Sequence, residues 1–492
     1  MKRIRFIKYP LIVLLSVIVY SAAAQTSQVL YFMNLPQNHL LNPSLRPTNS
    51  MYIGLPGFSG VGISASNNLF NFSDVFIRGR ADSVMTFLHP DYDIENFLPA
   101  IKDKNSLEPR LNVPIFGLGF SIGGDTYIFV DINERIEANF VLPGDIMKLG
   151  LQGNEQFRGS DIDLSSFRGD MKYYREAGIG FSKNFTNKLR LGFKTKMLFG
   201  IAAASVHNNS FGITVNDDYT HTLDADLMVN MSGPFRAYMT DDGKLDSLVF
   251  DDSRFDNGSG IARFLLNSKN FGVSFDLGAS YDISDKITVS AAVTDIGYIN
   301  WKSEPTNLEA KGRFEFGGFD MTRFADGSMS FDSLASVTLD SLKDAFVFND
   351  SRNPFTTFLP YGITVGGSYD LTSKVSIGLL SHSRIIGKQI KEALTLSANV
   401  NLGNALSFSL AYTAANHRYD NLGAGLSLRA GFFQIYAVAD RIPVGWNRII
   451  TENGNEFIVP ASWNTINARF GINFVFGNKI KKKDDKPMVL VE

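Results

Sequence analysis

Residues 391–414, KEALTLSANVNLGNALSFSLAYTA, decide the fold class because apolar and polar residues alternate through two consecutive segments. A period of two places alternate side chains on opposite faces of an extended strand. The tight polar turn at Gly403-Asn404 between the segments then predicts a β-hairpin. One face carries Leu394, Leu396, Ala398, Val400 and Leu402 and then Leu406, Phe408, Leu410 and Tyr412, and the other carries Thr395, Ser397, Asn399 and Asn401 and then Ser407, Ser409, Ala411 and Thr413.

Two kinds of protein contain a hairpin of this type. Each arm has roughly nine alternating residues, about the length that a tilted strand needs to cross the hydrocarbon layer of a membrane. The small hydroxyl and amide side chains of the polar face suit a hydrated barrel lumen. A water-soluble antiparallel sheet with one face on a core shows the same alternation. The hairpin alone therefore leaves both interpretations open.

The composition of the whole chain excludes several classes of protein. A formal net charge of −2 over 492 residues argues against a nucleic-acid binder or a strongly basic membrane-surface protein. The sequence has no cysteine, which excludes disulfides, thiolate metal sites, a cysteine nucleophile and a lipidated cysteine. With 41 Phe, 17 Tyr and 43 Gly, the chain favours many strands and turns over long helices. The length of the chain does not fix the number of domains, because large β-barrels exceed the usual domain size.

The first residues predict export. Lys2, Arg3, Arg5 and Lys8 precede an apolar run over residues 11–20, and small residues follow up to Ala24. This order is typical of a signal peptide over residues 1–24, cleaved after Ala24. A retained membrane helix is the alternative, but the run is short for a span and ends in a cleavage-type sequence. No other stretch approaches the roughly eighteen unbroken apolar residues of a helical span.

The mature chain divides into three parts. Residues 25–60 are rich in Asn, Pro and Ser and predict an irregular N-terminal lead-in, either folded into a barrel lumen as a plug, lying at the barrel mouth or forming the first periplasmic turn. Residues 61–477 carry the strand patterns of a β-barrel. Residues 478–492 hold a run of lysines and predict a charged, solvated C-terminal tail.

The strand patterns are arranged as a meander with two unequal ends. Three hairpins, at residues 178–192, 271–293 and 361–379, share one turn type that ends on a lysine, Lys188, Lys286 or Lys374. Their spacing is too long and uneven for a solenoid repeat. Long polar loops near 216–269 and 301–353 alternate with these short turns, which is the asymmetry of an outer-membrane barrel. In two later strands, Arg429 and Arg469 share a face with small polar residues, which fits a hydrated lumen.

Three stretches of the chain resemble strands and turns of exported barrels of the Bacteroidota. They are residues 359–379, which begin LPYG, residues 434–443, which include YAVADRIP, and the closing RFGINFVFG at 469–477. Together they make the chain similar to an uncharacterised family of outer-membrane β-barrels, a domain of unknown function, akin to the PorP/SprF and FadL-like groups. The resemblance implies an all-β, transmembrane antiparallel β-barrel of about fourteen strands with long surface loops.

The resemblance also implies two functions. The first is passive passage of a small or hydrophobic solute through the barrel, in contact with outer-membrane lipid. The alternative is a non-enzymatic structural or accessory role in a type IX secretion or gliding assembly, with secretion or motility proteins as partners. Neither function involves nucleic acid.

Residues able to carry chemistry are few, and none forms a persuasive site. His207 and His221 lie fourteen positions apart with no third ligand at a matching spacing. His382 lies between Ser381 and Ser383 at a strand end, which allows a lipase-type dyad but favours a loop or rim histidine. Acidic pairs in one long polar segment lack the spacing of a calcium loop and favour solvated acids; they are Asp217-Asp218, Asp241-Asp242 and Asp251-Asp252. We therefore expect no enzyme and no catalytic, cofactor or metal site.

Overall fold

The computed structural model describes residues 28–69, 76–78, 84–86, 92–240, 244–251, 253, 256–317, 341–403, 405–415, 418–442, 445–450, 456–460 and 465–477. The signal peptide expected at residues 1–24 and the charged tail expected at residues 478–492 lie outside these described residues. In the described part of the chain, no helix combines the length and the apolar character that crossing a membrane requires.

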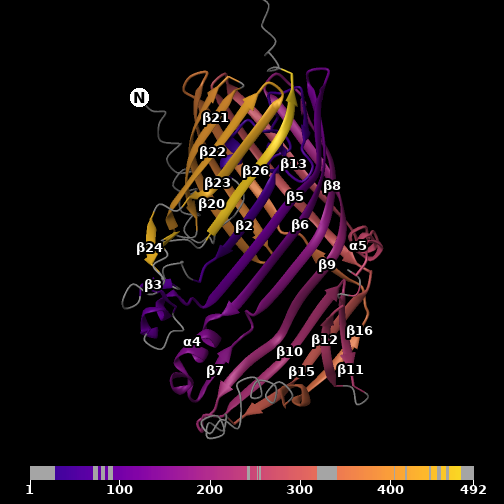
Figure 1. Cartoon of the computed structure of the whole chain (residues 1–492), viewed down its shortest axis with the longest axis vertical. Coiled ribbons are helices and arrows are strands. Elements are labelled where there is room, and N and C mark those ends of the chain that lie inside the picture. Colours follow the sequence, from indigo (N-terminus) through magenta and orange to yellow (C-terminus); the bar gives the residue numbers. More distant parts are fainter. Residues whose placement is uncertain are drawn as a thin grey trace, which may run out of the picture.

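The wall is a closed antiparallel barrel of fourteen strands, which confirms the predicted fold class (Figure 1). In this count β1 and β2 are one strand, because both lie between β26 and β5. Closure depends on β26, which pairs with both β1 and β2, and these pair in turn with β5. A closed sheet has no unpaired edge, so its backbone can lie within a lipid bilayer. In order around the barrel the positions are β1 Met51–Gly54 with β2 Val61–Asn67, β5 Lys104–Ile122, β6 Thr126–Pro143, β8 Arg168–Asn184, β9 Leu189–Val215, β13 Phe271–Ser284, β14 Ile287–Trp301, β18 Tyr361–Asp370, β19 Val375–Ile386, β20 Gln389–Leu402, β21 Leu406–Ala415, β22 Arg418–Ala430, β23 Phe433–Ile442 and β26 Thr465–Phe476.

The two ends of the barrel differ, as the turn pattern predicted. Short turns join β5 to β6, β8 to β9, β13 to β14, β18 to β19, β20 to β21 and β22 to β23, and they lie at the top of Figure 1. Glycines with positive φ form several of these turns, such as Gly123 and Gly124 with φ of 61° and 82°. The long connections leave from the opposite end.

The long connections are not simply loops, because their described parts extend the sheet beyond the barrel. β9 continues past the wall and pairs with β10 (His221–Ser232), which pairs with β15 (Pro305–Phe316), and β15 pairs with β16 (Phe346–Ser351). A small apolar core of Ala225, Leu308, Phe346 and Phe348 packs between these strands. The acids scattered through residues 216–269 and 301–353 obscured this alternation in the sequence. We call β10, β15, β16 and the far part of β9 the extension.

Smaller elements surround the mouth and the extension. The helices are α4 Gly144–Gln152 and α5 Gly258–Leu265, with 3-10 turns η4 Ile94–Asn96, η5 Leu98–Ala100 and η6 Glu155–Phe157. The short strands are β7 Ser160–Asp163, β17 Phe355–Phe358 and the pairs β3 Phe76–Arg78 with β4 Val84–Thr86, β11 Phe235–Met239 with β12 Leu245–Phe250, and β24 Trp446–Ile450 with β25 Glu456–Pro460.

Side chains of the wall strands alternate between the lumen and the outer face, as the alternation in the sequence predicted. On the β20–β21 hairpin, Leu396 and Leu410 point away from the lumen and are 57% and 50% exposed. Thr395 and Ser409, on the other face, are 0% and 1% exposed. Because exposed leucines in a closed barrel lie against lipid, this face belongs to the membrane belt.

Arginine at Leu396 or Leu410 should therefore lower the free energy of unfolding. Near mid-bilayer the expected loss is about 2–4 kcal/mol, because a guanidinium must then be taken into hydrocarbon. Denaturant unfolding of the barrel in lipid vesicles measures it. Val347→Arg is the control, since Val347 is exposed on β16 of the extension. Equal stability of Leu396→Arg and Val347→Arg would show that the β20–β21 face does not meet lipid.

Candidate functional site

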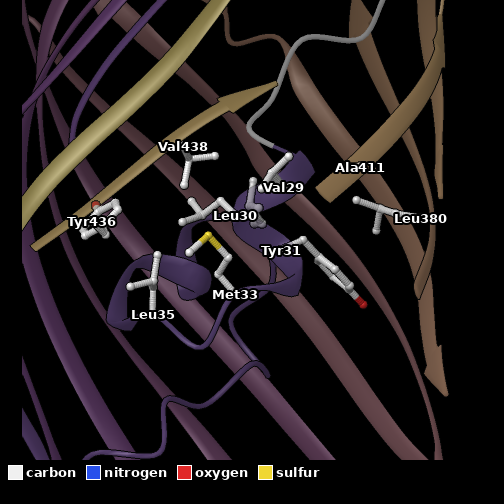
Figure 2. Packing of buried hydrophobic residues seen from close by; sticks show 10 residues of the cluster. Val29, Leu30, Tyr31, Met33, Leu35, Leu380, Ala411, Tyr436 and Val438 are labelled. Atoms are coloured by element: carbon white, nitrogen blue, oxygen red, sulfur yellow. The ribbon is translucent and has the colours of Figure 1, made fainter. Parts of the chain in front are cut away.

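Residues 28–50 lie inside the barrel rather than in its wall, and we call them the lumenal segment. The segment contains a short helix, α2 (Gln28–Phe32), and a 3-10 turn, η2 (Pro36–Leu40). Figure 2 shows its apolar side chains turned toward the wall. Of the placements open for residues 25–60, the described part therefore occupies the lumen up to residue 50 and then enters the wall as β1. The apolar cluster joins Val29, Leu30, Tyr31, Met33, Leu35 and Leu41 to Leu380, Ala411, Tyr436 and Val438 of the wall.

Hydrogen bonds tie the lumenal segment to strands around the barrel. Such bonds satisfy polar groups that burial would otherwise leave without partners. They include Asp440 Oδ1 accepting from the Val29 backbone at 2.8 Å, Gln37 Nε2 to Asn473 Oδ1 at 2.8 Å, Asn42 Nδ2 to Ser290 Oγ at 3.1 Å, Ser44 Oγ with Ser280 Oγ at 2.6 Å, Ser182 Oγ to the Ser44 carbonyl at 3.0 Å and Arg46 to the Gly124 carbonyl at 2.7 Å.

Glycines in the wall make room for the lumenal segment. At several inward positions a Cβ would lie less than 3.0 Å from an atom of the segment, a distance that real Cβ atoms essentially never show. A side chain at these positions would collide with the segment, so the wall and the segment are complementary in shape. The positions are Gly192 facing Pro43, Gly278 facing Asn42, Gly366 facing Tyr31, Gly378 facing Phe32, Gly423 facing Val29 and Gly425 facing Met33.

A network of buried ion pairs crosses the lumen next to the segment, and we call its strand residues the charge belt. Each buried cation has a carboxylate partner, which offsets the cost of removing charges from water. The contacts are Lys194 Nζ to Asp131 Oδ1 at 2.9 Å and Glu176 Oε1 at 3.1 Å, Arg135 to Glu176 at 2.8 Å and Asp295 at 3.6 Å, and Lys196 Nζ to Asp276 and Asp295 at 2.6 Å each.

The lumenal segment joins this network through one side chain. His39 Nε2 lies 3.1 Å from Asp131 Oδ2, and the His39 ring stacks on Phe129 with centroids 4.4 Å apart. His39 is therefore a polar anchor between the segment and β6. A charged or hydrogen-bonded contact of this kind fixes orientation more than it adds stability.

A local distortion of β14 directs Asp295 into the belt. The pairing of β13 with β14 shifts register between Phe275 and Leu277, and Asp295 has a φ of 64°. Such a β-bulge re-aims a side chain, and a non-glycine residue in this region of φ is strained. The backbone N–H of Asp295 is satisfied by Asp276 Oδ1 at 2.7 Å.

A cavity of about 110 Å³ lies between the lumenal segment and the polar wall. Leu30, Leu40 and Leu41 of the segment line its apolar side. The charged side chains around it are Arg110, Arg135, Glu137, Asp295, Arg384 and Arg469. Because the segment supplies part of the lining, the cavity has this shape only while the segment occupies the lumen.

The first barrel position is interrupted beside this cavity. β1 ends at Gly54 and β2 begins at Val61, and between them Ser59 is buried while Phe58 is exposed. The Ser59 carbonyl accepts from Gln37 Nε2 at 2.7 Å and from the Tyr436 hydroxyl at 3.1 Å. The interruption thus brings wall backbone into contact with the lumenal segment.

The structure places the histidines singled out in the sequence at separate locations. His382 is buried on the inner face of β19, with Nδ1 2.8 Å from Thr364 Oγ1, so its interpretation as a loop or rim histidine is wrong. The alternation of the strand turns Ser381 and Ser383 to the opposite face, which removes the dyad. His221 lies opposite Val215 and His207 opposite Met228 on the β9–β10 ladder, so these two do not meet.

Two acids of the pairs singled out in the sequence, Asp218 and Asp251, make local hydrogen bonds. Asp218 Oδ1 accepts from the Thr220 backbone at 3.1 Å, and Asp251 Oδ2 accepts from Arg236 at 2.9 Å. Asp241, Asp242 and Asp252 lie outside the described residues. Among the residues that the structure describes, no group of His, Asp and Glu side chains is arranged to hold a metal ion.

The charge belt is what sequence reasoning missed. Lys194 and Lys196 stand two positions apart in FKTKML, so both fall on one face of β9. Paired with the inward arginines, this pattern was a usable signal of a charged lumen. Their partners come from β6, β8, β13 and β14, and no local pattern reveals such pairs.

Comparison with known proteins identifies the family. Residues 43–440 match the family described as a family of unknown function, DUF5723, so the chain belongs to that family. No curated protein sequence gives a significant match.

Several solved barrels are similar in outline at very low identity. A FadL homologue from Pseudomonas aeruginosa shares 9% identity with a TM-score of 0.41, covering 93% of this chain and 100% of its own. The toluene transporter TodX from Pseudomonas putida shares 9% with a TM-score of 0.37, covering 92% and 93%. The translocator domain of the autotransporter NalP from Neisseria meningitidis shares 8% with a TM-score of 0.32, covering 88% and 91%. The strand pairing described above, and not these similarities, establishes the barrel.

The fit between wall and segment is testable at Gly192. A Cβ there would collide with the Pro43 backbone, which cannot rotate away as a side chain would. Gly192→Ala should lower the free energy of unfolding by roughly 1–3 kcal/mol, the usual cost of overpacking. Denaturant unfolding in lipid vesicles measures the loss.

Gly367→Ala is the matched control for this experiment. Gly367 lies in β18 on the outer face, and its Cβ would meet its nearest atom at 3.4 Å, an ordinary contact. If the two variants were equally stable, the segment would not be packed against Gly192 in solution.

Proposed function

We propose that this DUF5723 member is an outer-membrane β-barrel through which a small solute passes passively when the lumenal segment shifts. One observation carries the proposal: the segment occupies part of the lumen and is held there mainly by side-chain contacts, and only its last residue, Ser50, bonds to wall strands through its backbone on both sides. Its bonds to the wall are individual hydrogen bonds, each with a net worth of roughly 1 kcal/mol. The arrangement supports a closed barrel whose filling is able to move independently of the wall.

The lining favours a hydrophilic solute over a hydrophobic one. Sites for apolar molecules are lined mainly by hydrophobic and aromatic side chains. Here the wall beside the segment carries the charge belt and small polar residues, such as Thr395, Ser397 and Asn399. A small polar molecule would exchange its water for these groups at little cost, whereas an apolar one would gain nothing from them.

A disulfide lock tests whether the segment must move. Ser44 Oγ and Ser280 Oγ lie 2.6 Å apart, and the chain has no native cysteine. In the Ser44→Cys, Ser280→Cys double variant, we expect oxidation to abolish solute flux through the barrel and reduction to restore it. Single-channel conductance in a planar bilayer, read before and after reductant, measures this.

Two further variants complete the test. Ser44→Cys alone is the control and should respond to neither oxidant nor reductant. Deletion of residues 28–46 should give steady conductance. The deletion ends before β1, because Met51–Gly54 belong to the barrel wall. Identical conductance of the oxidised and reduced double variant, together with a silent deletion variant, would contradict the proposal.

A second candidate is the accessory role in a secretion or gliding assembly. It is favoured by the β11–β12 hairpin, where Tyr238, Leu248 and Phe250 are about half exposed outside the barrel. Exposed apolar clusters of this kind mark protein contacts. A stoichiometric protein partner copurifying from native membranes, combined with a barrel that never conducts, would replace the passage proposal by this one.

A further inference from the structure

The cavity beside the lumenal segment has an excess of arginine. Four arginines line it, Arg110, Arg135, Arg384 and Arg469, against two carboxylates, Glu137 and Asp295. An arginine guanidinium stays charged under all ordinary conditions. Among the side chains that line the cavity, positive charges therefore outnumber negative ones.

Most of these arginines already have carboxylate partners within the wall. Arg135 pairs with Glu176 and Asp295, Arg384 lies 3.0 Å from Glu137, and Arg110 lies 3.7 Å from Glu108. Glu108 also pairs with Lys391, so its charge is shared between two cations.

Arg469 differs from the other lining arginines because it has no ion-pair partner among the described residues. Its Nη1 donates to the Gly60 carbonyl at 3.2 Å, and within the described part of the chain no carboxylate lies in ion-pair range of it. Asp440 acts on Arg469 only from beyond that range. A buried charge without a close counter-charge is costly, so an anion beside Arg469 would stabilise this arrangement. The neighbouring Asn467 is uncharged and supplies none.

Buried donors around the cavity also lack acceptors. The Nε atoms of Arg384 and Arg469 are inaccessible to solvent and have no hydrogen-bond partner among the described residues. Arg384 is only 9% exposed as a whole. Buried polar atoms are normally satisfied, so unpaired arginine donors on two strands, β19 and β26, mark a place for an acceptor.

We propose that this cavity binds a small oxyanion, a phosphate, sulfate or carboxylate group, between Arg384 and Arg469. The planar fork of arginine matches the paired oxygens of such a group. The cavity of about 110 Å³ admits a compact anion with few additional atoms. Leu30, Leu40 and Leu41 would lie against the uncharged side of the ligand.

As an assignment of solute class, this inference rests on the proposed passage function; as a binding site, it stands by itself. Because the lumenal segment forms part of the cavity, the anion binds the closed barrel and stabilises it by mass action. Binding and passage are therefore separable experimentally.

Titration calorimetry of the full-length barrel in detergent and a zwitterionic buffer tests the site. Inorganic phosphate and acetate should bind, while acetamide, the neutral analogue of acetate, should not. Arg469→Gln should weaken phosphate binding at least about tenfold, the effect of losing one charge-assisted interaction. Arg469→Lys keeps the charge without the fork and should give an intermediate affinity.

Arg429→Gln is the matched control. Arg429 is a second inward arginine, but it bonds to the backbone carbonyls of Gly431 and Gly477 at the short-turn end and does not line the cavity. Phosphate affinity should be unchanged in it. Equal binding of acetamide and acetate, no binding of phosphate to the parent, or equal affinities in Arg469→Gln and the parent would each overturn the inference.

The oxidised Ser44→Cys, Ser280→Cys barrel separates this test from that of passage. With the segment locked in place, phosphate should bind with the parent affinity. A barrel that binds phosphate but never conducts would leave the oxyanion site standing and remove the passage function. A barrel that conducts but binds no oxyanion would leave the passage function standing and remove the oxyanion site.

Discussion

The pairing of β26 with β1 and β2 is the constraint on which the rest of the structure depends. Within a bilayer no water is available to backbone groups, so every strand needs two neighbours. Residues Met51 and Phe476, near opposite ends of the chain, meet in this seam. The seam also decides where the lumenal segment lies. β1 begins at the short-turn end, and the chain just before it, held by Ser50 pairing to the Phe476 carbonyl, turns inward from that rim.

Once the barrel is closed, its interior has to be filled or hydrated. The small inward residues of the wall leave space, and the lumenal segment occupies part of it with Val29, Leu30 and Met33. Wall glycines bring segment and strand into close contact. Beyond the segment the filling changes from apolar packing to ion pairs, whose members come from several strands. The cavity lies at the boundary of these two kinds of filling, which explains its mixed lining.

Much of the wall was predictable from local pattern. Alternation at 391–414 gave the correct lipid and lumen faces, and the turn lysines marked three hairpins that the structure contains. The inward direction of Arg469 also followed from the period of two. The extension was missed because acids interrupt its alternation. His382 was wrongly predicted to lie in a loop or at the rim because the sequence does not show where the strand ends. In the structure β19 continues to Ile386, four residues beyond His382.

The sequence by itself determined the strands, their faces and the inequality of the two barrel ends, because side-chain alternation and turn chemistry are local properties. Only the tertiary structure decided which residues became partners. Asp131, Lys194 and Asp295 carry no mark of one another in the chain, since cross-barrel distances depend on strand order, stagger and closure. The same holds for Arg384 and Arg469, which line one cavity because closure brings β19 and β26 to face the same lumenal segment.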